Sequence, residues 1–440
     1  MSRFTGDGGL RVLLLGATGL IGSSVAARLH GDGHQVVAVT RSRGPDSMRL
    51  PVAQWVEMDL RSATAPEAWL PHLDGMDAVV NCAGVLQDGG RDSTVAVHQE
   101  GPDALWEACE RTDVRRIVHL SAIGADSGGL TPFSHSKLAG DEALKGRDLD
   151  WVILRPSVVV GRPAYGGSAL FRGLAALPVL VRTPDAGPLD IVQLGDVVET
   201  VAQMIEPAAP ARVELELAGP ERLSFEEVVQ TYRAWLGWKP ARLVTLPGFL
   251  IGAAYKLGDL AGKLGWRPPI RSTAQREIVR GAIGDASEWK RLTGIEPRSL
   301  SSALAAEAAS VQERWFASLY LLKPLIIVTF ALFWLLTGFV SLGPGYYVAE
   351  WLMRAAGAAR PISDLSVVAG GVADIVVGLG ILVRRTSRPA LIAALFLSVF
   401  YIIAGTLLHP ELWRDPLGPM MKIWPILALN LVCLAILRER

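Results

Sequence analysis

The sequence predicts an α/β fold, a doubly wound parallel sheet with a small substrate subdomain, followed by an all-α transmembrane four-helix bundle. In the first part of the chain, short apolar runs alternate with longer amphipathic stretches, which is the pattern of βαβ units. Half of the 440 residues are hydrophobic and the mean hydropathy is +0.32, which is typical of a chain that lies partly in lipid. We expect the α/β domain at residues 1–298, a connector helix at 299–322 and the membrane domain at 323–440.

Five short apolar runs are the expected strands of the sheet. They are RVLLLG, HQVVAVT, DAVVNCAG, RRIVHLSA and DWVILRPSVV, beginning at Arg11, His34, Asp77, Arg115 and Asp150. Residues 166–188 are rich in Gly, Pro and Ala, and this composition predicts a loop or lid. Residues 246–266 carry apolar side chains at helical spacing. That segment either lies at a membrane surface or packs against the substrate subdomain.

The first strand leads directly into the motif GATGLIG, which is followed by a stretch with helical spacing. Gly16 permits the tight turn, Gly19 lets the backbone approach a pyrophosphate, and Gly22 lets helix and strand pack closely. The helix N-terminus also offers N–H groups to an anion. We expect a nucleotide to be held by this turn, at Gly16, Thr18, Gly19, Leu20, Ile21 and Gly22. A purely structural turn is the alternative, because the spacing is G-x-x-G-x-x-G rather than G-x-G-x-x-G.

The residues after the second strand bear on the choice of nucleotide. About 20 residues beyond the glycines, an NAD(H)-binding chain would carry a carboxylate for the ribose 2'-hydroxyl. This chain instead reads Thr40-Arg41-Ser42-Arg43. The guanidinium of Arg41 suits a 2'-phosphate, so we expect NADP(H) to be preferred, with NAD(H) possible. A solvated surface arginine is the alternative interpretation.

Four apolar segments near the end of the chain predict four transmembrane helices and make the lipid bilayer an expected partner. They cover residues 324–349, 365–383, 389–408 and 423–437, and Asp374 is their one charged residue. Each is near the roughly 20 residues that cross a hydrocarbon core, although the last is short. The basic loop Arg384 to Arg388 and the tail Arg438 to Arg440 would fall on the same side. The positive-inside rule then places the α/β domain and the C-terminus in the cytoplasm, at the inner or cytoplasmic membrane.

Asp374 is costly at mid-helix depth unless it faces a polar partner or a cavity. We expect it inside the bundle, with Asn430 as a candidate partner. It would either carry protons or bind a head group, or make a packing contact.

The composition excludes other classes of function. Lys and Arg number 43, as do Asp and Glu, and no basic run is interleaved with aromatics, so we expect no nucleic acid partner. The three cysteines, Cys82, Cys109 and Cys433, have no metal-type spacing, so we expect no metal site. The N-terminus lacks the pattern of a secretory signal, which agrees with a cytoplasmic first domain.

The first domain resembles the short-chain dehydrogenase/reductase superfamily in its extended or atypical branch, which implies a Rossmann-type NAD(P)-binding fold. The resemblance implies an adenine contact in MDL, cofactor contacts in NCAG, the active-site serine in HLSA, the family's lysine in HSKLAG and the nicotinamide-side strand and loop in LRPSVVVG. The residues in question are Asp59, Leu60, Asn81, Ala83, Gly84, Ser121, Lys137 and Pro156. The stretches VQLGDVVE and LTGIEPRSL resemble members related to the nucleotide-binding accessory subunit of respiratory complex I. The membrane part resembles the four-helix DoxX-like family in hydropathy and layout.

One residue departs from the family pattern. The family's tyrosine, four positions before the lysine, is the general acid/base for a substrate carbonyl, and here that position is Phe133. Phenylalanine cannot transfer a proton. Tyr165, which follows the nicotinamide-side strand, is a candidate replacement, and a plain loop tyrosine is the alternative. The candidate catalytic residues are therefore Ser121, Lys137 and Tyr165.

Two functions follow from these features. The chain is either a membrane-anchored NAD(P)(H)-dependent oxidoreductase acting on an apolar substrate such as a quinone or an isoprenoid lipid, or a catalytically inactive nucleotide sensor or structural subunit of a membrane complex. A complex partner and a homo-oligomer both remain open.

Overall fold

The computed structural model describes residues 9–44, 47–89, 92–125, 131–266 and 268–437. The chain divides into two compact units, one of residues 1–258 and 269–315 and the other of residues 259–268 and 316–440. We describe each unit by itself. The tail Arg438 to Arg440, used in the topology prediction, lies outside the described residues.

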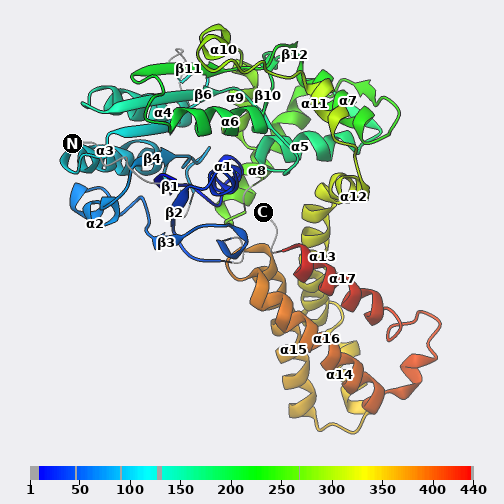
Figure 1. The fold of residues 1–440 in the computed structure, drawn as a ribbon. Coiled ribbons are helices and arrows are strands. Elements are labelled where there is room, and N and C mark those ends of the chain that lie inside the picture. The colour runs from blue at the N-terminus through cyan, green and yellow to red at the C-terminus, as the bar shows by residue number, and fades with distance from the viewer. Residues whose placement is uncertain (1–8, 45–46, 90–91, 126–130, 267, 438–440) are drawn as a thin grey trace. The chain divides into compact units, whose positions relative to one another are not determined.

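A seven-stranded parallel sheet forms the centre of the first unit, in the order β11-β6-β5-β4-β1-β2-β3 (Figure 1). All five predicted strands are present in it, and β3 and β11 were not predicted. Both of these lie at the edges of the sheet and have polar sequences, QWVE and VELEL, that lack the long apolar runs of the central strands. The strands are β1 (Arg11–Leu15), β2 (Gln35–Thr40), β3 (Gln54–Glu57), β4 (Ala78–Asn81), β5 (Arg116–Leu120), β6 (Asp150–Pro156) and β11 (Val213–Leu217).

Helices cover both faces of this sheet, because successive side chains of a strand point to opposite sides. Val12 and Leu14 of β1 belong to one buried apolar cluster, and Leu13 and Leu15 belong to the other. The first cluster includes residues of α1 and α6, and the second includes residues of α3. The helices of the first unit are α1 (Leu20–Gly31), α2 (Leu70–Leu73), α3 (Gly101–Arg111), α4 (Pro132–Lys145), α5 (Gly166–Ala175), α6 (Leu194–Met204), α7 (Phe225–Trp235), α9 (Ser272–Arg280), α10 (Ser287–Thr293) and α11 (Leu300–Ala306).

One prediction, that of a loop or lid at residues 166–188, is corrected by the structure. The Gly- and Ala-rich stretch that begins at residue 166 is not a loop, because it forms α5 and then β8. Its apolar residues Ala169, Leu170 and Phe171 are buried, and Phe171 stacks against Tyr232 of α7. The short strands here pair two by two and are β7 (Val159–Val160), β8 (Val179–Val181), β9 (Leu189–Asp190), β10 (Val192–Gln193), β12 (Arg222–Leu223) and β13 (Arg242–Val244).

Two helices contain residues of both units. α8 (Gly248–Lys263) passes the boundary after Gly258, and α12 (Val311–Tyr320) passes it after Trp315. The expected single connector helix is two helices, α11 and α12, which residues 307–310 separate. The Ser310 N–H and hydroxyl both donate to Glu313 Oε2 in the manner of a helix cap, so α12 begins independently of α11.

The second unit consists mainly of helices (Figure 1). Of its described residues, α13 (Leu322–Leu342), α15 (Arg360–Leu382) and α16 (Ser387–Leu408) are long and apolar enough to cross a membrane, with hydropathies of 2.4, 2.2 and 2.5. The fourth predicted span is α17 (Ile423–Ile436), which has 14 residues. The short helix α14 (Tyr346–Ala355) lies between α13 and α15 in the chain. Leu336, Phe396 and Leu407 are more than half exposed, as expected of side chains that face lipid.

Glycines allow α13 and α15 to pack closely. A Cβ at Gly338 would lie 2.5 Å from the Gly371 carbonyl oxygen, and one at Gly378 would lie 2.9 Å from that of Ala331. Small residues at such contacts are common between transmembrane helices, where the gain comes from close packing rather than from the hydrophobic effect.

Asp374 of α15 is inside this bundle, as predicted, with 2% of its surface exposed. The candidate partner Asn430 was wrong. Tyr401 Oη of α16 donates a hydrogen bond to Asp374 Oδ1 at 2.8 Å, whereas Asn430 Nδ2 donates to the Leu391 carbonyl oxygen at 3.1 Å. The bundle therefore places Asp374 against α16 and not against α17.

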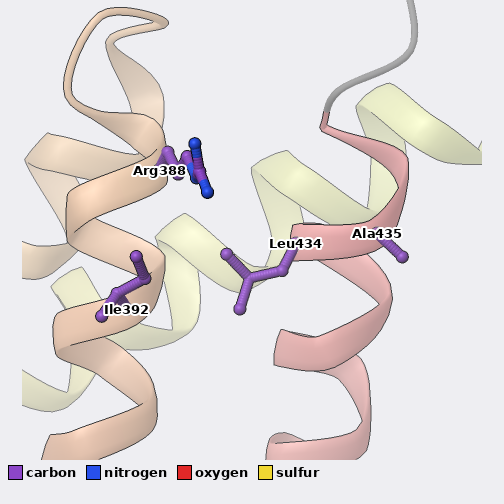
Figure 2. Close-up of a pocket in the computed structure, with 4 residues that line it drawn as sticks. All are labelled: Arg388, Ile392, Leu434 and Ala435. Carbon is purple, nitrogen blue, oxygen red and sulfur yellow. The ribbon is translucent and has the colours of Figure 1, made fainter. Parts of the chain in front are cut away.

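A groove of about 380 Å³ runs between α16 and α17 (Figure 2). Arg388 and Ile392 line it from α16, and Leu434 and Ala435 line it from α17. In Figure 2 the Leu434 side chain points towards α16. Apart from the Arg388 guanidinium this lining is apolar. Because the groove separates α16 from α17, these two helices are less closely packed here than α13 and α15.

Candidate nucleotide-binding and catalytic site

The glycine motif forms the turn between β1 and α1, and the structure requires glycine at two of its three positions. Gly16 has a φ of +72°, and a Cβ there would lie 2.7 Å from the backbone of Cys82 and Ala83. A Cβ at Gly22 would lie 2.2 Å from the Gly16 carbonyl oxygen. Both positions are therefore closed to any other residue.

Gly19 differs, because the protein itself does not fill the space beside it. A Cβ at Gly19 would meet only the Gly16 carbonyl oxygen, at 3.2 Å. Gly19 is also the N-cap of α1, and as a glycine it makes no side-chain cap hydrogen bond to the first turn of that helix. Open space beside a glycine, next to N–H groups of a helix N-terminus, fits the pyrophosphate of a dinucleotide. The residues present thus fit the expected cofactor.

Lys137 lies in α4 beside the end of β4. Its Nζ donates to the Leu120 carbonyl oxygen at 2.7 Å and lies 3.4 Å from that of Ala83, and a Cβ at Gly84 would be 3.6 Å from Nζ. Lys137 is 4% exposed, and burial lowers the pKa of its ammonium to about 8 despite the opposing charge of Asp141. The structure thus brings together Lys137, Ala83 and Gly84, three of the predicted site residues.

Ser121 follows β5, and its hydroxyl is occupied within the protein. Its Oγ donates to Asp141 Oδ2 at 2.8 Å. Arg155 of β6 also donates to Asp141, from Nη2 at 3.1 Å, and His119 Nε2 lies 3.4 Å from Asp141 Oδ1. Burial acts to raise the pKa of Asp141, but the close contact with His119, the hydrogen bond from Ser121 and the charge of Arg155 outweigh it and lower that pKa. Asp141 is therefore a buried carboxylate that orients Ser121.

Phe133 lies one turn before Lys137 in α4, edge-on to the imidazole of His98 with ring centroids 5.5 Å apart. The Val85 N–H donates to His98 Nε2 at 3.0 Å, so the ring proton is on Nδ1, which lies 2.8 Å from Ser136 Oγ. Burial lowers the pKa of His98 to about 2. His98 is therefore a neutral ring fixed by two hydrogen bonds, and it does not replace the missing tyrosine as an acid.

Tyr165 is the N-cap residue of α5, where it is 41% exposed. Within the described part of the chain, it shares no hydrogen bond or ring contact with Ser121, Phe133 or Lys137. Its catalytic role remains a prediction, and its local role is to begin α5.

The predicted adenosine-side residues are engaged with other side chains. Arg41 follows β2, and its Nη1 lies 2.7 Å from Asp92 Oδ1, with 39% of its side chain exposed. Asp59 receives hydrogen bonds from the Arg61 guanidinium, at 2.6 Å from Nη2, and this contact lowers the pKa of the Asp59 carboxyl. Leu60 is buried in the apolar cluster that includes α3. Asn81 Oδ1 accepts from the Ala83 N–H at 3.0 Å, which fixes the turn after β4, and Pro156 ends β6.

α9 supplies two residues that sequence reasoning missed. Thr131 and Ser134, at the start of α4, both donate to Glu277 Oε1. Arg280 Nη1 donates to Ser134 Oγ at 2.6 Å and to the Gly124 carbonyl oxygen at 3.2 Å. These contacts hold α9 against the end of α4 that carries Phe133. No local pattern in the sequence indicates this pairing, because the two segments are more than 140 residues apart.

Two other missed residues could have been found from spacing. Asp141 is one helical turn after Lys137 on the same face of α4, and His119 is two residues before Ser121 on the same face of β5. This spacing predicts that Asp141 lies near Lys137 and that His119 lies near Ser121, the two residues that the family resemblance identifies.

Comparisons with known proteins agree with this geometry. Residues 16–174 match the family described as NAD(P)H-binding, and residues 331–431 match the DoxX-like family. Among solved structures, the Bordetella bronchiseptica enzyme WbmG in complex with NAD is similar in fold, with a TM-score of 0.52 at 16% identity over 68% of this chain and 93% of that one.

Three curated relatives are each 25% identical to this chain. The 40 kDa subunit of mitochondrial NADH-ubiquinone oxidoreductase from Neurospora crassa matches 67% of this chain and 78% of its own length. Sterol demethylase protein B from Methylococcus capsulatus matches 69% and 99%, and ceramide reductase from Caulobacter vibrioides matches 59% and 80%. These matches agree with the glycine turn, the parallel sheet, the buried lysine and the apolar helices of the structure. The chain thus joins an NAD(P)H-binding domain of Rossmann-type fold to a region that matches the DoxX-like family.

Proposed function

We propose that this chain is a membrane-anchored NAD(P)(H)-dependent oxidoreductase that acts on an apolar, lipid- or quinone-type substrate. The observation that carries the choice of substrate is the surface of α8. Phe249, Leu250, Leu257 and Leu260 are 73%, 45%, 66% and 54% exposed, and Gly258 is the one buried residue in this fully described helix. An exposed apolar face on one helix supports contact with lipid. The relatives named for a sterol and a ceramide are consistent with such a substrate.

The chemistry follows from the residues around Lys137. When NADPH is bound, its nicotinamide supplies a hydride, two electrons with one hydrogen, to a carbonyl or quinone, which also takes one proton to give an alcohol or a hydroquinone. In this chain, the turn at Gly19 would bind the pyrophosphate and Lys137 would donate to the ribose hydroxyls. With a pKa near 8, Lys137 can also release the proton that Phe133 cannot supply. Ser121 would reach a substrate oxygen only by leaving Asp141.

Purified full-length protein in nanodiscs tests this proposal. NADPH oxidation is followed with a quinone, a sterol-derived ketone and a ceramide-derived ketone, and we expect turnover with at least one of them. Lys137→Met should reduce kcat by about a hundredfold or more, because both a ribose contact and a proton source are lost. Lys145→Met, at the C-terminal end of the same helix, is the control, because Lys145 pairs with Glu142 and Glu214 rather than with the groups around Ser121. Turnover that survives Lys137→Met would place the chemistry elsewhere.

A specific observation favours a second function, that of a nucleotide-binding sensor or a structural subunit of a membrane complex. Phe133 occupies the position of the proton donor, and Asp141 holds the Ser121 hydroxyl. One relative is named as a subunit of NADH-ubiquinone oxidoreductase. Tight nucleotide binding without turnover on any acceptor, in the parent and also in Phe133→Tyr, would support this function over the enzyme.

The same proposal includes an orientation in the membrane. The loop Arg384 to Arg388 would be cytoplasmic together with the first unit, because basic residues are retained on that side. Single cysteines placed at Asp415 and at Arg385, with the native cysteines replaced, are labelled from outside intact cells. We expect the reagent to reach residue 415 and not residue 385, and the reverse result would invert the orientation.

A further inference from the structure

The first unit contains a cavity of about 270 Å³ whose lining includes no residue of the glycine turn and only Val160 and Gly161, the end of the predicted nicotinamide-side loop, from the predicted nucleotide site. Its walls come from α1, α5, α6, α7, α11 and the loop after β7, so it lies between the Rossmann-type sheet domain and the substrate subdomain. Three arginines, Arg162, Arg172 and Arg298, line it, against a single carboxylate, that of the exposed Glu307. The cavity is therefore positively charged.

The three arginines differ in whether a carboxylate lies close enough to balance the positive charge. Arg162 is 65% exposed and lies 3.6 Å from Glu313, and Arg298 is 52% exposed and lies 3.5 Å from Asp196. Arg172 is 2% exposed, and no carboxylate among the described residues lies within ion-pair distance of it. A buried charge without a counter-ion has a high desolvation cost, so an anionic ligand would stabilise this guanidinium.

The contacts of Arg172 hold it in place without neutralising it. Its Nη2 donates to the Gly161 carbonyl oxygen at 2.6 Å, and its guanidinium lies over the rings of Tyr232 and Trp235, 5.6 and 5.4 Å from their centroids. Its Nε has no hydrogen-bond partner. A fixed guanidinium with an unused N–H is preorganised to bind a planar or tetrahedral oxyanion.

The cavity that contains Arg172 is also lined by a second buried donor, Gln193. Gln193 pairs with Val160 in the register of β10 and β7, lines the same cavity, and is 6% exposed. Its Nε2 also has no hydrogen-bond partner. The Tyr232 hydroxyl, which also lines the cavity, is likewise without a partner among the described residues. Three such buried polar groups in one small cavity are unusual in a folded protein, and a ligand that accepts from them would account for all three.

We propose that this cavity is a second ligand site, which binds the phosphate or carboxylate group of a small organic anion through Arg172. Gln193 is a neutral donor at the site, and Arg162 and Arg298 form its charged entrance. The site goes beyond the proposed oxidoreductase function and does not depend on it. Because Arg172 also holds the Gly161 carbonyl, the anion and the nicotinamide-side loop ending at Gly161 share one side chain.

Calorimetric titration of the full-length protein tests the site, with inorganic phosphate and malonate as probes and with NADPH saturating so that the glycine turn is occupied. We expect at least one probe to bind. Arg172→Gln should weaken it about tenfold to a hundredfold, the effect of losing one charge-assisted contact. Arg291→Gln should leave the affinity unchanged, because Arg291 is 66% exposed, like Arg162, but lies outside the cavity. Binding of phosphate alone would identify a phosphoryl ligand, and binding of malonate alone a carboxylate.

Two results would overturn the proposal. One is the absence of phosphate and malonate binding at millimolar concentrations, and the other is an unchanged affinity in Arg172→Gln. If Arg172→Gln fails to fold by circular dichroism, the double variant Arg162→Gln, Arg298→Gln decides. It should weaken the probe severalfold and reduce the salt dependence of binding, since two charges are removed from the entrance. An unchanged affinity there would likewise reject the site.

Discussion

Asp141 of α4 and Asp374 of α15 are both almost fully buried, at 0% and 2% exposure, but their surroundings differ. Asp141 accepts hydrogen bonds from Ser121 and Arg155, and the Arg155 guanidinium matches its charge. Asp374 accepts one hydrogen bond, from the neutral Tyr401, and no described Lys, Arg or His forms an ion pair with it.

This difference shows how the medium around each unit limits its buried polar groups. In the first unit, a network of several polar side chains can offset the desolvation of a charged pair, because each member has further partners. In an apolar bundle, a second buried charge would add its own desolvation cost, and a hydroxyl supplies a hydrogen bond without that cost. The network in the first unit therefore fixes side chains at a site, whereas the pair in the second is isolated.

The largest expected effect is at Asp141. Asp141→Ala removes this carboxylate from the buried Arg155, which keeps Glu214 2.9 Å away, and frees Ser121. We expect the free energy of unfolding of the first unit to fall by about 3 kcal/mol or more, as measured by denaturant unfolding. Glu142→Ala, on the neighbouring exposed position, is the control. A loss below about 1 kcal/mol would mean that Asp141 is no more important to the fold than Asp374.

The next largest expected effect is the pH dependence of folding stability that Lys137 causes. Burial lowers its pKa from 10.5 to about 8, so between these values the unfolded chain binds more protons than the folded one. The stability of the parent should therefore rise with pH from about 8 to 10.5 relative to Lys137→Met, and below pH 8 the cost of the buried charge is fully present. Chemical denaturation of both proteins across this range measures the difference. Parallel curves would show that Lys137 is not buried as a cation.

Arg41 should affect nucleotide choice rather than stability. Arg41→Ala should weaken NADP(H) binding by about 1.5 to 3 kcal/mol and leave NAD(H) nearly unchanged, if its guanidinium exchanges Asp92 for the 2'-phosphate. Asp92→Asn should strengthen NADP(H) binding, since the competing carboxylate is removed. Titration with both dinucleotides measures each effect. Equal affinities for the two dinucleotides in the parent would reject the role of Arg41.

The smallest effect is expected at Asp374. In Asp374→Asn the amide oxygen can still accept from Tyr401, so the stability in detergent micelles should change by less than about 1 kcal/mol. Tyr401→Phe, which removes the donor, should have a similar effect. If Asp374→Asn abolishes turnover while the bundle stays folded, the isolated pair takes part in function, and its contrast with Asp141 is one of role as well as of surroundings.

The sequence by itself determined the features that depend on neighbours along the chain. The glycine turn follows from the spacing of Gly16, Gly19 and Gly22, the central strands from their apolar runs, and the long membrane helices from uninterrupted hydropathy. These patterns are local, because a turn, a strand and an apolar helix each express the chemistry of consecutive residues. Lys137 was found in the same way, from a motif within one helix.

The tertiary structure alone decided which side chains meet. It paired Asp374 with Tyr401 rather than Asn430, and it made a helix of a glycine-rich stretch because Phe171 packs against α7. It also lined the cavity of Arg172 with three arginines and a single carboxylate, that of Glu307. Packing brings together residues that are distant in the chain, and their contacts then outweigh local propensity, which amounts to only about 1 kcal/mol for each residue.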